Sequence, residues 1–145
     1  MEPSRPAFCH TVTVRFNEVD RAGIAFFGRV FEWCHEAYEE LFAAAGFPVQ
    51  RIFEREDWAM PLVHAEADYR RPMRLGEQLR IEVRIERLGA HSMTFGYTIH
   101  GADGSLRASA KLVHAFVELA QFRRRAVPEE LCRALAALGL LPAEG

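Results

Sequence analysis

Residues 29–45 read RVFEWCHEAYEELFAAA, and this stretch decides the expected fold. Its apolar residues recur at spacings of three and four, which predicts an amphipathic helix from Arg29 to Ala45. These residues are Phe31, Cys34, Tyr38, Leu41, Phe42 and Ala45, and glutamates 32, 36, 39 and 40 occupy much of the other face. Gly46 suits the position after a helix end, and Pro48 prevents continuation. Because Trp33 and Ala37 widen the apolar surface, we expect this helix to be covered on more than one side.

The chain on both sides of the helix has the period of two that is typical of half-buried strands. One such run, Thr11 to Phe16, precedes the helix. Four runs follow it, at residues 61–72, 79–86, 93–100 and 105–119. Asp103-Gly104 predicts a hairpin turn, and disturbed alternation near Leu112-Val113 predicts a bulge. Residues 128–138 predict a short terminal helix with proline in its first turn.

This order of elements predicts a single α+β domain over residues 1–145. Short connections between the last four strands favour an antiparallel meander. A long apolar helix and a sheet with one apolar face bury each other. We therefore expect an antiparallel sheet wrapped around a central helix.

Composition narrows the classes of function. A net charge of −2 over 145 residues argues against nucleic acid as the main partner, because phosphate binding normally shows as a basic patch. No apolar stretch reaches the roughly 20 residues that span a bilayer, and Met1 to Phe8 lacks the apolar region of a signal peptide. The cysteines at positions 9, 34 and 132 form no disulfide framework and match no zinc spacing. We expect a cytoplasmic protein with reduced thiols, no membrane contact and no metal.

The loop before the helix, FNEVDRAGIAFFG at residues 16–28, is the candidate for chemistry. The first NH groups of a helix lack partners within the helix and suit an oxyanion. The Asp20 carboxylate beside them is able to attack a thioester, or to activate a water, while these donors hold the developing charge. An aspartate before a helix is also a common N-cap. The length and apolarity of the loop after Asp20 weaken the capping interpretation, but spacing alone leaves both open.

The run Asp20-Arg21-Ala22-Gly23-Ile24 resembles the D-x-A-G-I/V motif of the 4-hydroxybenzoyl-CoA thioesterase family, which has the hotdog fold. The resemblance covers residues 11–119 and continues in CHEAYEE, residues 34–40, and PLVHAEADYRRP, residues 61–72. The later stretches resemble the 1,4-dihydroxy-2-naphthoyl-CoA thioesterase branch in particular. The resemblance implies hydrolysis of an acyl-CoA with an aromatic or small acyl group, giving free acid and CoA.

The resemblance also implies roles for single residues. Asp20 matches the catalytic aspartate of the family, and Phe27 matches the position whose backbone NH polarises the thioester carbonyl. Family members bind CoA in a cleft between two subunits, so we expect a homodimer or a dimer of dimers. The residues expected to bind substrate are Gly23, Ile24, His64, Arg87, His91 and Ser92. CoA is part of the substrate, and no cofactor is expected.

Two other functions stay open. A hotdog hydratase or dehydratase needs a histidine with a carboxylate in the helix region, for which His35 with Glu36 or Glu39 is the candidate. A non-catalytic acyl-CoA-binding module would keep the fold and lose turnover. Glu18 is expected to be solvated, and the three arginines at positions 123–125 are expected to form a solvated charge cluster.

Overall fold

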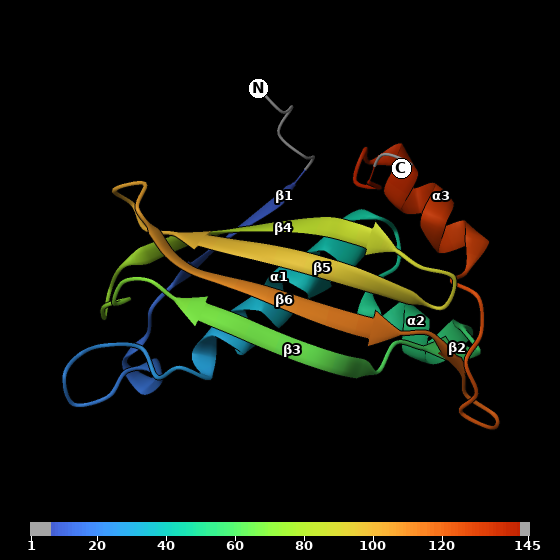
Figure 1. Cartoon of the computed structure of the whole chain (residues 1–145), viewed down its shortest axis with the longest axis horizontal. Helices are drawn as coiled ribbons and strands as arrows, with labels where there is room; N and C mark the ends of the chain where they lie inside the picture. Colours follow the sequence, from blue (N-terminus) through green and yellow to red (C-terminus); the bar gives the residue numbers. More distant parts are fainter. Residues whose placement is uncertain (1–6, 143–145) are drawn as a thin grey trace.

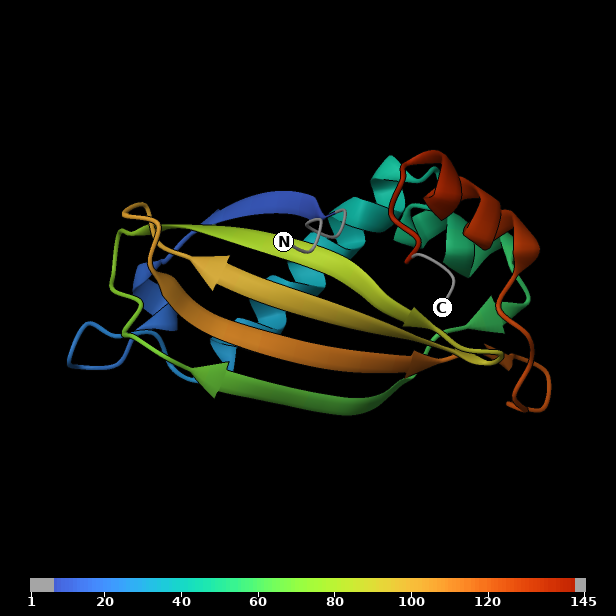
Figure 2. The same cartoon turned by 45° about the horizontal axis from the view of Figure 1, so that its top comes forward.

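The computed structural model describes residues 7–142 and contains a curved antiparallel sheet with a long helix against one face (Figures 1 and 2). The helices are the short 3-10 helix η1 (Phe16–Glu18), α1 (Arg29–Ala44), α2 (Val49–Arg55) and α3 (Glu129–Ala137). The strands are β1 (Phe8–Thr13), β2 (Trp58–Ala59), β3 (Leu62–Tyr69), β4 (Gln78–Leu88), β5 (Ser92–His100), β6 (Leu106–Ala115) and β7 (Val117–Glu118). The expected α+β class is confirmed. The ends of the predicted domain, and most of the stretch in which no signal peptide is expected, lie outside the described residues.

The predicted long helix is confirmed as α1 and ends at Ala44, one residue earlier than expected. Gly46 follows it with a φ of +84°, a left-handed conformation that glycine adopts without steric cost. The Phe47 NH then donates to the Phe42 carbonyl at 2.8 Å and closes the last turn. The chain continues into α2, which is not predicted because it is only seven residues long and buries one of them, Ile52. Within residues 7–142, no helix is long and apolar enough to cross a membrane.

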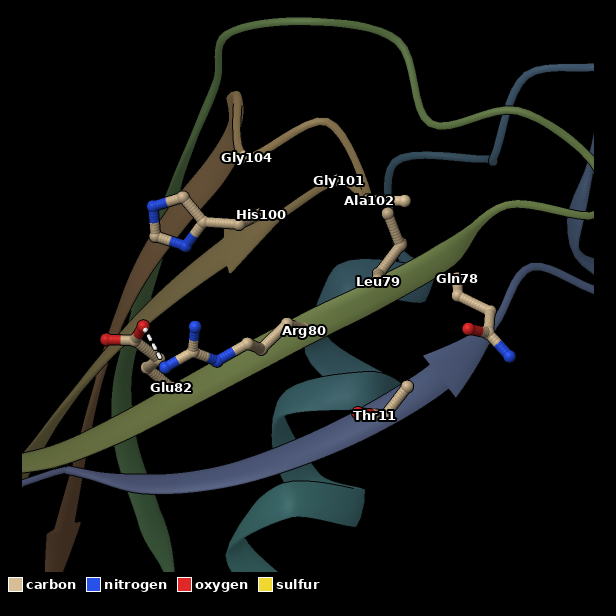
Figure 3. Close-up of a pocket in the computed structure, with 9 residues that line it drawn as sticks. All are labelled: Thr11, Gln78, Leu79, Arg80, Glu82, His100, Gly101, Ala102 and Gly104. Carbon is tan, nitrogen blue, oxygen red and sulfur yellow. Dashed lines mark ion pairs between the residues drawn. The ribbon is translucent and has the colours of Figure 1, made fainter.

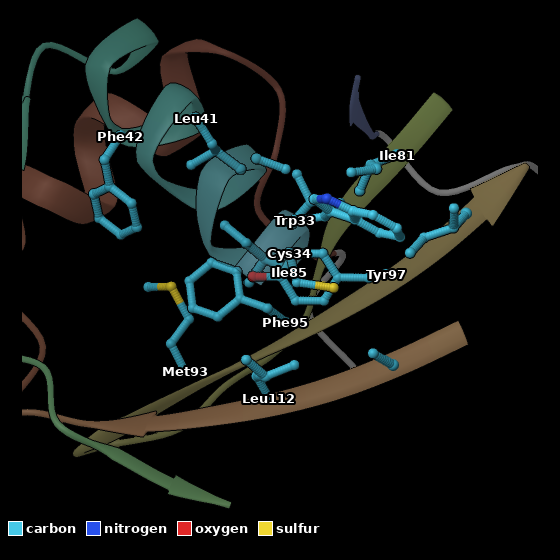
Figure 4. Close-up of a cluster of buried hydrophobic side chains, with 14 of the residues drawn as sticks. Trp33, Cys34, Leu41, Phe42, Ile81, Ile85, Met93, Phe95, Tyr97 and Leu112 are labelled. Atoms are coloured by element: carbon cyan, nitrogen blue, oxygen red, sulfur yellow. The ribbon is translucent and has the colours of Figure 1, made fainter. Parts of the chain in front are cut away.

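One face of α1 is completely buried in the hollow of the sheet. Its buried residues are Val30, Trp33, Cys34, Ala37, Leu41 and Phe42. They share a core with inward side chains of the central strands, among them Ile81, Phe95 and Leu112 (Figure 4). Trp33 and Ala37 are therefore covered within the chain itself. The sheet curls around this side of the helix, so the cover that the apolar surface of α1 was expected to need comes from the same chain.

The strand order is β1-β4-β5-β6-β3, so the predicted meander is confirmed only for β4, β5 and β6. β3 pairs with β6 instead of β4, and residues 70–77 connect one edge of the sheet to its interior. Burial explains the difference. The inward side chains of β4 and β5 are buried, as central strands require, whereas most of β3 is exposed. β3 and β1 are the two edges of the sheet (Figure 1).

The bulge predicted near Leu112-Val113 occurs beside that position, but in the neighbouring strand β3 and not in β6. Leu62 pairs with His114 and His64 pairs with Val113, so the extra residue is Val63 in β3. The last strand is also shorter than predicted. β6 ends at Ala115, and β7 separates from it to pair with β2.

The boundaries of the first strand are wrong by three residues, since β1 ends at Thr13 and not at Phe16. The Glu18 carboxylate accepts a hydrogen bond of 2.7 Å from the Arg15 NH, and this contact starts η1. The turn leaves the Phe16 side chain 83% exposed, although the alternation predicts an inward position.

Two smaller predictions are confirmed. The hairpin turn between β5 and β6 contains Gly104 with a φ of +82°, and the Gly104 NH donates to the Gly101 carbonyl at 2.9 Å. The terminal helix is present as α3, and Pro128 lies at its N-cap.

Candidate active site

The loop before α1 is held in a compact shape by its own hydrogen bonds. Val19 and Ala25 form an isolated antiparallel bridge, and the Phe26 NH donates to the Glu18 carbonyl at 2.9 Å. At the tip, the Gly23 NH donates to the Asp20 carbonyl at 2.9 Å. Gly23 has a φ of +79°, which explains why a glycine occupies this turn. The position of Asp20 is thus determined by the backbone of the loop.

The Asp20 carboxylate is oriented by the same loop. Its Oδ1 accepts hydrogen bonds from the Ala22 NH at 2.8 Å and the Ile24 NH at 3.4 Å. Its Oδ2 accepts none within residues 7–142. Helix α1 begins after Gly28, which is its N-cap residue. Asp20 therefore stabilises its own turn and does not cap the helix, so the capping interpretation is wrong.

Two backbone donors lie free at the start of α1. In the described part of the chain, the NH groups of Phe27 and Gly28 have no hydrogen-bond acceptor. The Phe27 carbonyl accepts a hydrogen bond of 2.6 Å from the Tyr69 hydroxyl, at the end of β3. The Phe27 side chain is 61% exposed and so does not cover these donors from within the core. The arrangement suits an oxyanion.

Glu18 and Tyr69 support the loop, although the sequence predicts no such role for either of them. Glu18 is not simply solvated, because its carboxylate accepts a 2.7 Å hydrogen bond from the indole NH of buried Trp33. The expectation failed because Trp33 is fifteen residues away in the sequence. The sequence pattern does not mark Tyr69 as a site residue. Its position at the end of the alternation, next to Arg70, is the only sequence signal for it.

The structure does not bring all predicted site residues together in one chain. Gly23 and Ile24 lie in the loop with Asp20. The turn that carries Arg87, His91 and Ser92 joins β4 to β5 at the opposite end of the sheet from that loop (Figures 1 and 2). His64 lies on β3 next to Glu66, with 3.1 Å between Nε2 and Oε1. Its neighbour Ala65 pairs with buried Leu112, so the alternation of the strand directs His64 to the face away from α1.

A cavity of about 330 Å³ lies between α1, α2, β2 and the end of β6. Its walls are mainly aromatic and aliphatic, with Tyr38, Phe42, Ile52 and Trp58 among them. The lining residues with polar side-chain groups are His35, Tyr38, Trp58 and His114. The residues of the Asp20 loop do not line it.

A second hollow, of about 400 Å³, has several polar and charged residues in its lining, unlike the apolar cavity. It lies over β1, β4 and β5, next to the turn after β5 (Figure 3). Arg80 is its cation and forms an ion pair of 3.0 Å with Glu82. None of the predicted site residues lines this hollow.

The histidine and carboxylates considered for a hydratase do not form a pair. The Glu36 carboxylate lies 3.6 Å from His10 Nε2, on β1. The His35 ring instead stacks on Tyr38, with ring centroids 5.7 Å apart, and burial lowers its pKa below the ordinary value. The described residues therefore offer no His35–Glu36 acid–base pair.

Comparison with known proteins identifies the family to which this chain belongs. Residues 14–135 match the model of the Thioesterase-like superfamily. A 1,4-dihydroxy-2-naphthoyl-CoA hydrolase of Prochlorococcus marinus (strain MIT 9303) is 34% identical over 134 residues, which cover 88% of both chains. A protein of the same name from Synechococcus elongatus is 34% identical over 119 residues, covering 81% of this chain and 87% of that protein. The crystal structure of a 1,4-dihydroxy-2-naphthoyl-CoA thioesterase from Synechocystis matches with a TM-score of 0.84 at 29% identity, covering 90% of this chain and 96% of that one.

The chain belongs to the thioesterase-like superfamily. The expected hotdog fold and the expected class of enzyme, a thioester hydrolase, are confirmed. The roles of the individual site residues stay predictions.

Proposed function

We propose that this thioesterase hydrolyses an acyl-CoA to the free acid and CoA, with Asp20 as its catalytic carboxylate and the Phe27 NH as oxyanion donor. One observation carries the proposal. The loop that starts α1 leaves a carboxylate oxygen of Asp20 and the NH groups of Phe27 and Gly28 without partners in the described chain. A free nucleophile or base and free donors are the two kinds of group that thioester hydrolysis requires.

Two routes fit this geometry. In one, Asp20 Oδ2 attacks the thioester carbon, CoA leaves as the thiolate, and water hydrolyses the resulting anhydride. In the other, Asp20 takes a proton from a water that attacks the carbon directly, and CoA again leaves. The Phe27 NH holds the carbonyl oxygen while it carries negative charge. Water is the only second reactant in both routes, so the proposal includes no cofactor.

The relatives suggest the chemical class of the substrate. They are named for 1,4-dihydroxy-2-naphthoyl-CoA, whose acyl group is a hydroxylated bicyclic aromatic. The loop of this chain presents Phe26 and Phe27 at its surface, 54% and 61% exposed, as part of an apolar wall next to the free donors. We therefore assign an aromatic acyl group. Trp33 is excluded from that wall because it is buried in the core.

The proposed active unit is at least a dimer of this chain, in which β3 pairs with β3 of a second copy. As an edge strand, β3 has one side without a neighbouring strand in the described chain. It also exposes Leu62 and Val63, 43% and 61%, next to that edge. Antiparallel pairing about a two-fold axis would set the Leu62 end of one copy against the Tyr69 end of the other. The Arg87, His91 and Ser92 turn of one copy would then serve the nucleotide of a thioester held at the loop of the other.

The cellular location belongs to the same proposal. The cysteines in the described residues, Cys9, Cys34 and Cys132, are all free. Burial raises the pKa of the Cys34 thiol to about 12, so this residue stays a protonated core side chain. Free thiols persist in a reducing compartment, and we place the protein in the cytoplasm.

The test is Asp20→Asn, assayed with a panel of acyl-CoA thioesters and a thiol reagent. The amide keeps the shape and cannot act as an anionic nucleophile or base, so we expect kcat to fall roughly a hundredfold or more. Glu129→Gln, which removes an exposed carboxylate on α3, is the matched control and should keep full activity. Near-normal turnover by Asp20→Asn would transfer the catalytic role to the glutamates of α1. Binding of acyl-CoA without thiol release by the wild type would favour the non-catalytic module.

A further inference from the structure

The cavity between α1, α2, β2 and β6 has the composition of a small-molecule site. Its volume of about 330 Å³ falls within the range of roughly 300–1,000 Å³ that is typical of ligand pockets. None of the residues that line it carries a carboxylate, guanidinium or ammonium group. Phe42, Trp58 and Tyr38 provide flat apolar surfaces that suit an aromatic ring. A neutral aromatic ligand fits this chemistry, and a charged one does not.

His114 adds one polar group whose hydrogen-bonding role is determined by its surroundings. The side chain is only 3% exposed, and its Nδ1 lies 2.9 Å from the Met60 carbonyl oxygen. A carbonyl only accepts, so Nδ1 carries the hydrogen, and in the neutral ring Nε2 is an acceptor. Nε2 is buried and has no hydrogen-bond partner within residues 7–142. A buried acceptor without a partner is costly, which points to a donor that is supplied by a ligand.

The surroundings of this imidazole favour its neutral form. The His114 ring stacks on Tyr38 with ring centroids 4.8 Å apart and faces the His35 ring at 5.9 Å. Burial lowers the pKa of His114, and the neighbouring His35 lowers it further, although the hydrogen bond to Met60 acts in the opposite direction. Burial lowers the pKa of His35 as well. These surroundings favour a neutral His114 ring in the cavity wall, with Nε2 as an acceptor that has no partner in the described residues.

We propose that this cavity binds the acyl group of the thioester and that His114 Nε2 accepts a hydrogen bond from a hydroxyl group on its aromatic ring. The inference rests on the proposed hydrolysis and adds the residue that selects the substrate. A ring without the hydroxyl would leave Nε2 buried and unpaired. The cavity thus discriminates between acyl groups of nearly equal size by a single polar atom.

The position of the cavity indicates that it serves the loop of a second copy. Tyr38 lies ten residues beyond Gly28, so at about 1.5 Å per residue it is about 15 Å along the helix axis from the free NH groups. Met60 and His114 lie beside Leu62, at the β3 end opposite Tyr69. Antiparallel pairing of β3 with its copy would bring this end of one chain to the Phe27 end of the other.

The first experiment compares naphthoyl-CoA with a set of hydroxynaphthoyl-CoA thioesters, one for each ring position, in the wild-type enzyme. At least one hydroxylated substrate should have a kcat/KM about tenfold or more above that of the parent. Calorimetry with the corresponding free acids should show the same order of affinity without any turnover. Equal kcat/KM values and equal affinities across the set would overturn the assignment.

Two variants at one position separate the acceptor from the packing of the ring. His114→Asn places an amide NH2 where Nδ1 lies, so it keeps the bond to Met60 and loses the Nε2 acceptor. His114→Gln reaches the Nε2 position and keeps an acceptor there. We expect His114→Asn to lower kcat/KM for the hydroxylated substrate about tenfold more than kcat/KM for the parent, so that the preference is lost. We expect His114→Gln to keep much of that preference. Loss of activity on both substrates to the same extent in both variants would show a purely structural role and would overturn the proposal.

Mixed dimers test which loop the cavity serves. His35→Trp should fill the cavity from the exposed side of α1 and inactivate the enzyme. Equal amounts of His35→Trp and Asp20→Asn chains, unfolded together and refolded, should form mixed dimers as half of the product. If each site combines one loop with the cavity of the other chain, one of the two sites in each mixed dimer is intact, and about a quarter of wild-type activity returns. No return of activity from dimers shown to be mixed would overturn the placement across the interface.

The outcomes distinguish this inference from the proposed function. An active wild type that Asp20→Asn inactivates, but that shows no hydroxyl preference, contradicts the role of His114 alone. A wild type that binds hydroxylated acids with a preference removed by His114→Asn, yet hydrolyses no acyl-CoA, contradicts the proposed hydrolysis and keeps the site.

Discussion

The Tyr69 hydroxyl donates a hydrogen bond of 2.6 Å to the Phe27 carbonyl oxygen and so joins the end of β3 to the start of α1. In a trans peptide the carbonyl and the following NH point in opposite directions. Tyr69 therefore orients the peptide between Phe27 and Gly28 and directs the free Gly28 NH away from β3. A residue 42 positions away in sequence thus helps to define the donors at the start of the helix.

Tyr69→Phe should lower kcat about threefold to tenfold, with a smaller change in KM. The variant removes one hydrogen bond, worth about 0.5–1.5 kcal/mol, and loosens the donors in the transition state more than it weakens substrate binding. Because the Tyr69 side chain is 45% exposed, the midpoint of thermal unfolding should change little. Steady-state kinetics and a thermal melt of the same sample give both values, and an unchanged kcat would mean that the loop holds these donors without Tyr69.

Glu18→Ala should destabilise the protein by about 1–2 kcal/mol in urea denaturation. The Glu18 carboxylate accepts hydrogen bonds of 2.7 Å from both the Trp33 indole and the Arg15 NH, and its loss leaves the buried indole NH unpaired. Glu18→Gln keeps an acceptor and serves as the control, with less than half of that loss. Equal stability of the alanine variant and the wild type would show that water replaces the carboxylate.

Val63→Asp should weaken the proposed dimer. Val63 is the extra residue of the β3 bulge, lies at the free edge and is 61% exposed in the single chain. A charge there would be buried against the second copy, at a cost that should raise the dissociation constant at least tenfold. Leu138→Asp, at the C-cap of α3, is the matched control and should leave the dimer intact, because α3 lies away from β3 (Figure 1). Sedimentation velocity over a dilution series measures both, and a wild type that is monomeric and fully active would contradict the shared site.

The free energy of unfolding should fall as the pH is lowered below about 6.5. Burial lowers the pKa of both His35 and His114, so below this pH the unfolded chain binds more protons than the folded one. The free energy of unfolding therefore rises with pH until the pH reaches the pKa of histidine in the unfolded chain, and it decreases in acid. The slope is at most about 1.4 kcal/mol per pH unit for each proton. Urea denaturation at pH 7.5, 6.5 and 5.5 gives the slope. His114→Gln, which has no titrating group at this position, should have the shallower slope.

A second loss of stability is expected below pH 4. The Asp103 pKa is lowered to about 2, chiefly by its hydrogen bonds to Ser105 and also by Arg107, and the hydrogen bond from Arg107 lowers the pKa of Glu77. A group whose pKa is lower in the folded chain stabilises that chain at any pH above its pKa in the unfolded chain. This contribution is lost as the pH falls through the pKa of the group in the folded chain. The acid limb of the pH series should therefore steepen below pH 4, and a flat limb there would contradict the role of this cluster.

Much of this protein is determined by its sequence alone. The spacing in residues 29–45 predicts α1 to within one residue, because burial of one helical face requires that period. Alternation locates β4, β5 and β6, since one face of each strand packs on the helix. The Asp20 loop is visible as a glycine-containing segment before a helix, and its turn chemistry is local.

The tertiary structure alone decided the rest. Alternation tells which face of a strand is buried but not which strand lies beside it, so the place of β3 next to β6 was not predictable from the pattern. Glu18 meets Trp33, Tyr69 meets Phe27, and His114 meets Met60 across 15, 42 and 54 positions of the sequence. These partners are determined by the curl of the sheet around α1, which is a property of the packed whole. For the same reason, the sequence contains His114 at an apolar position of its strand, but only the folded chain shows that its Nε2 has no partner in the described residues.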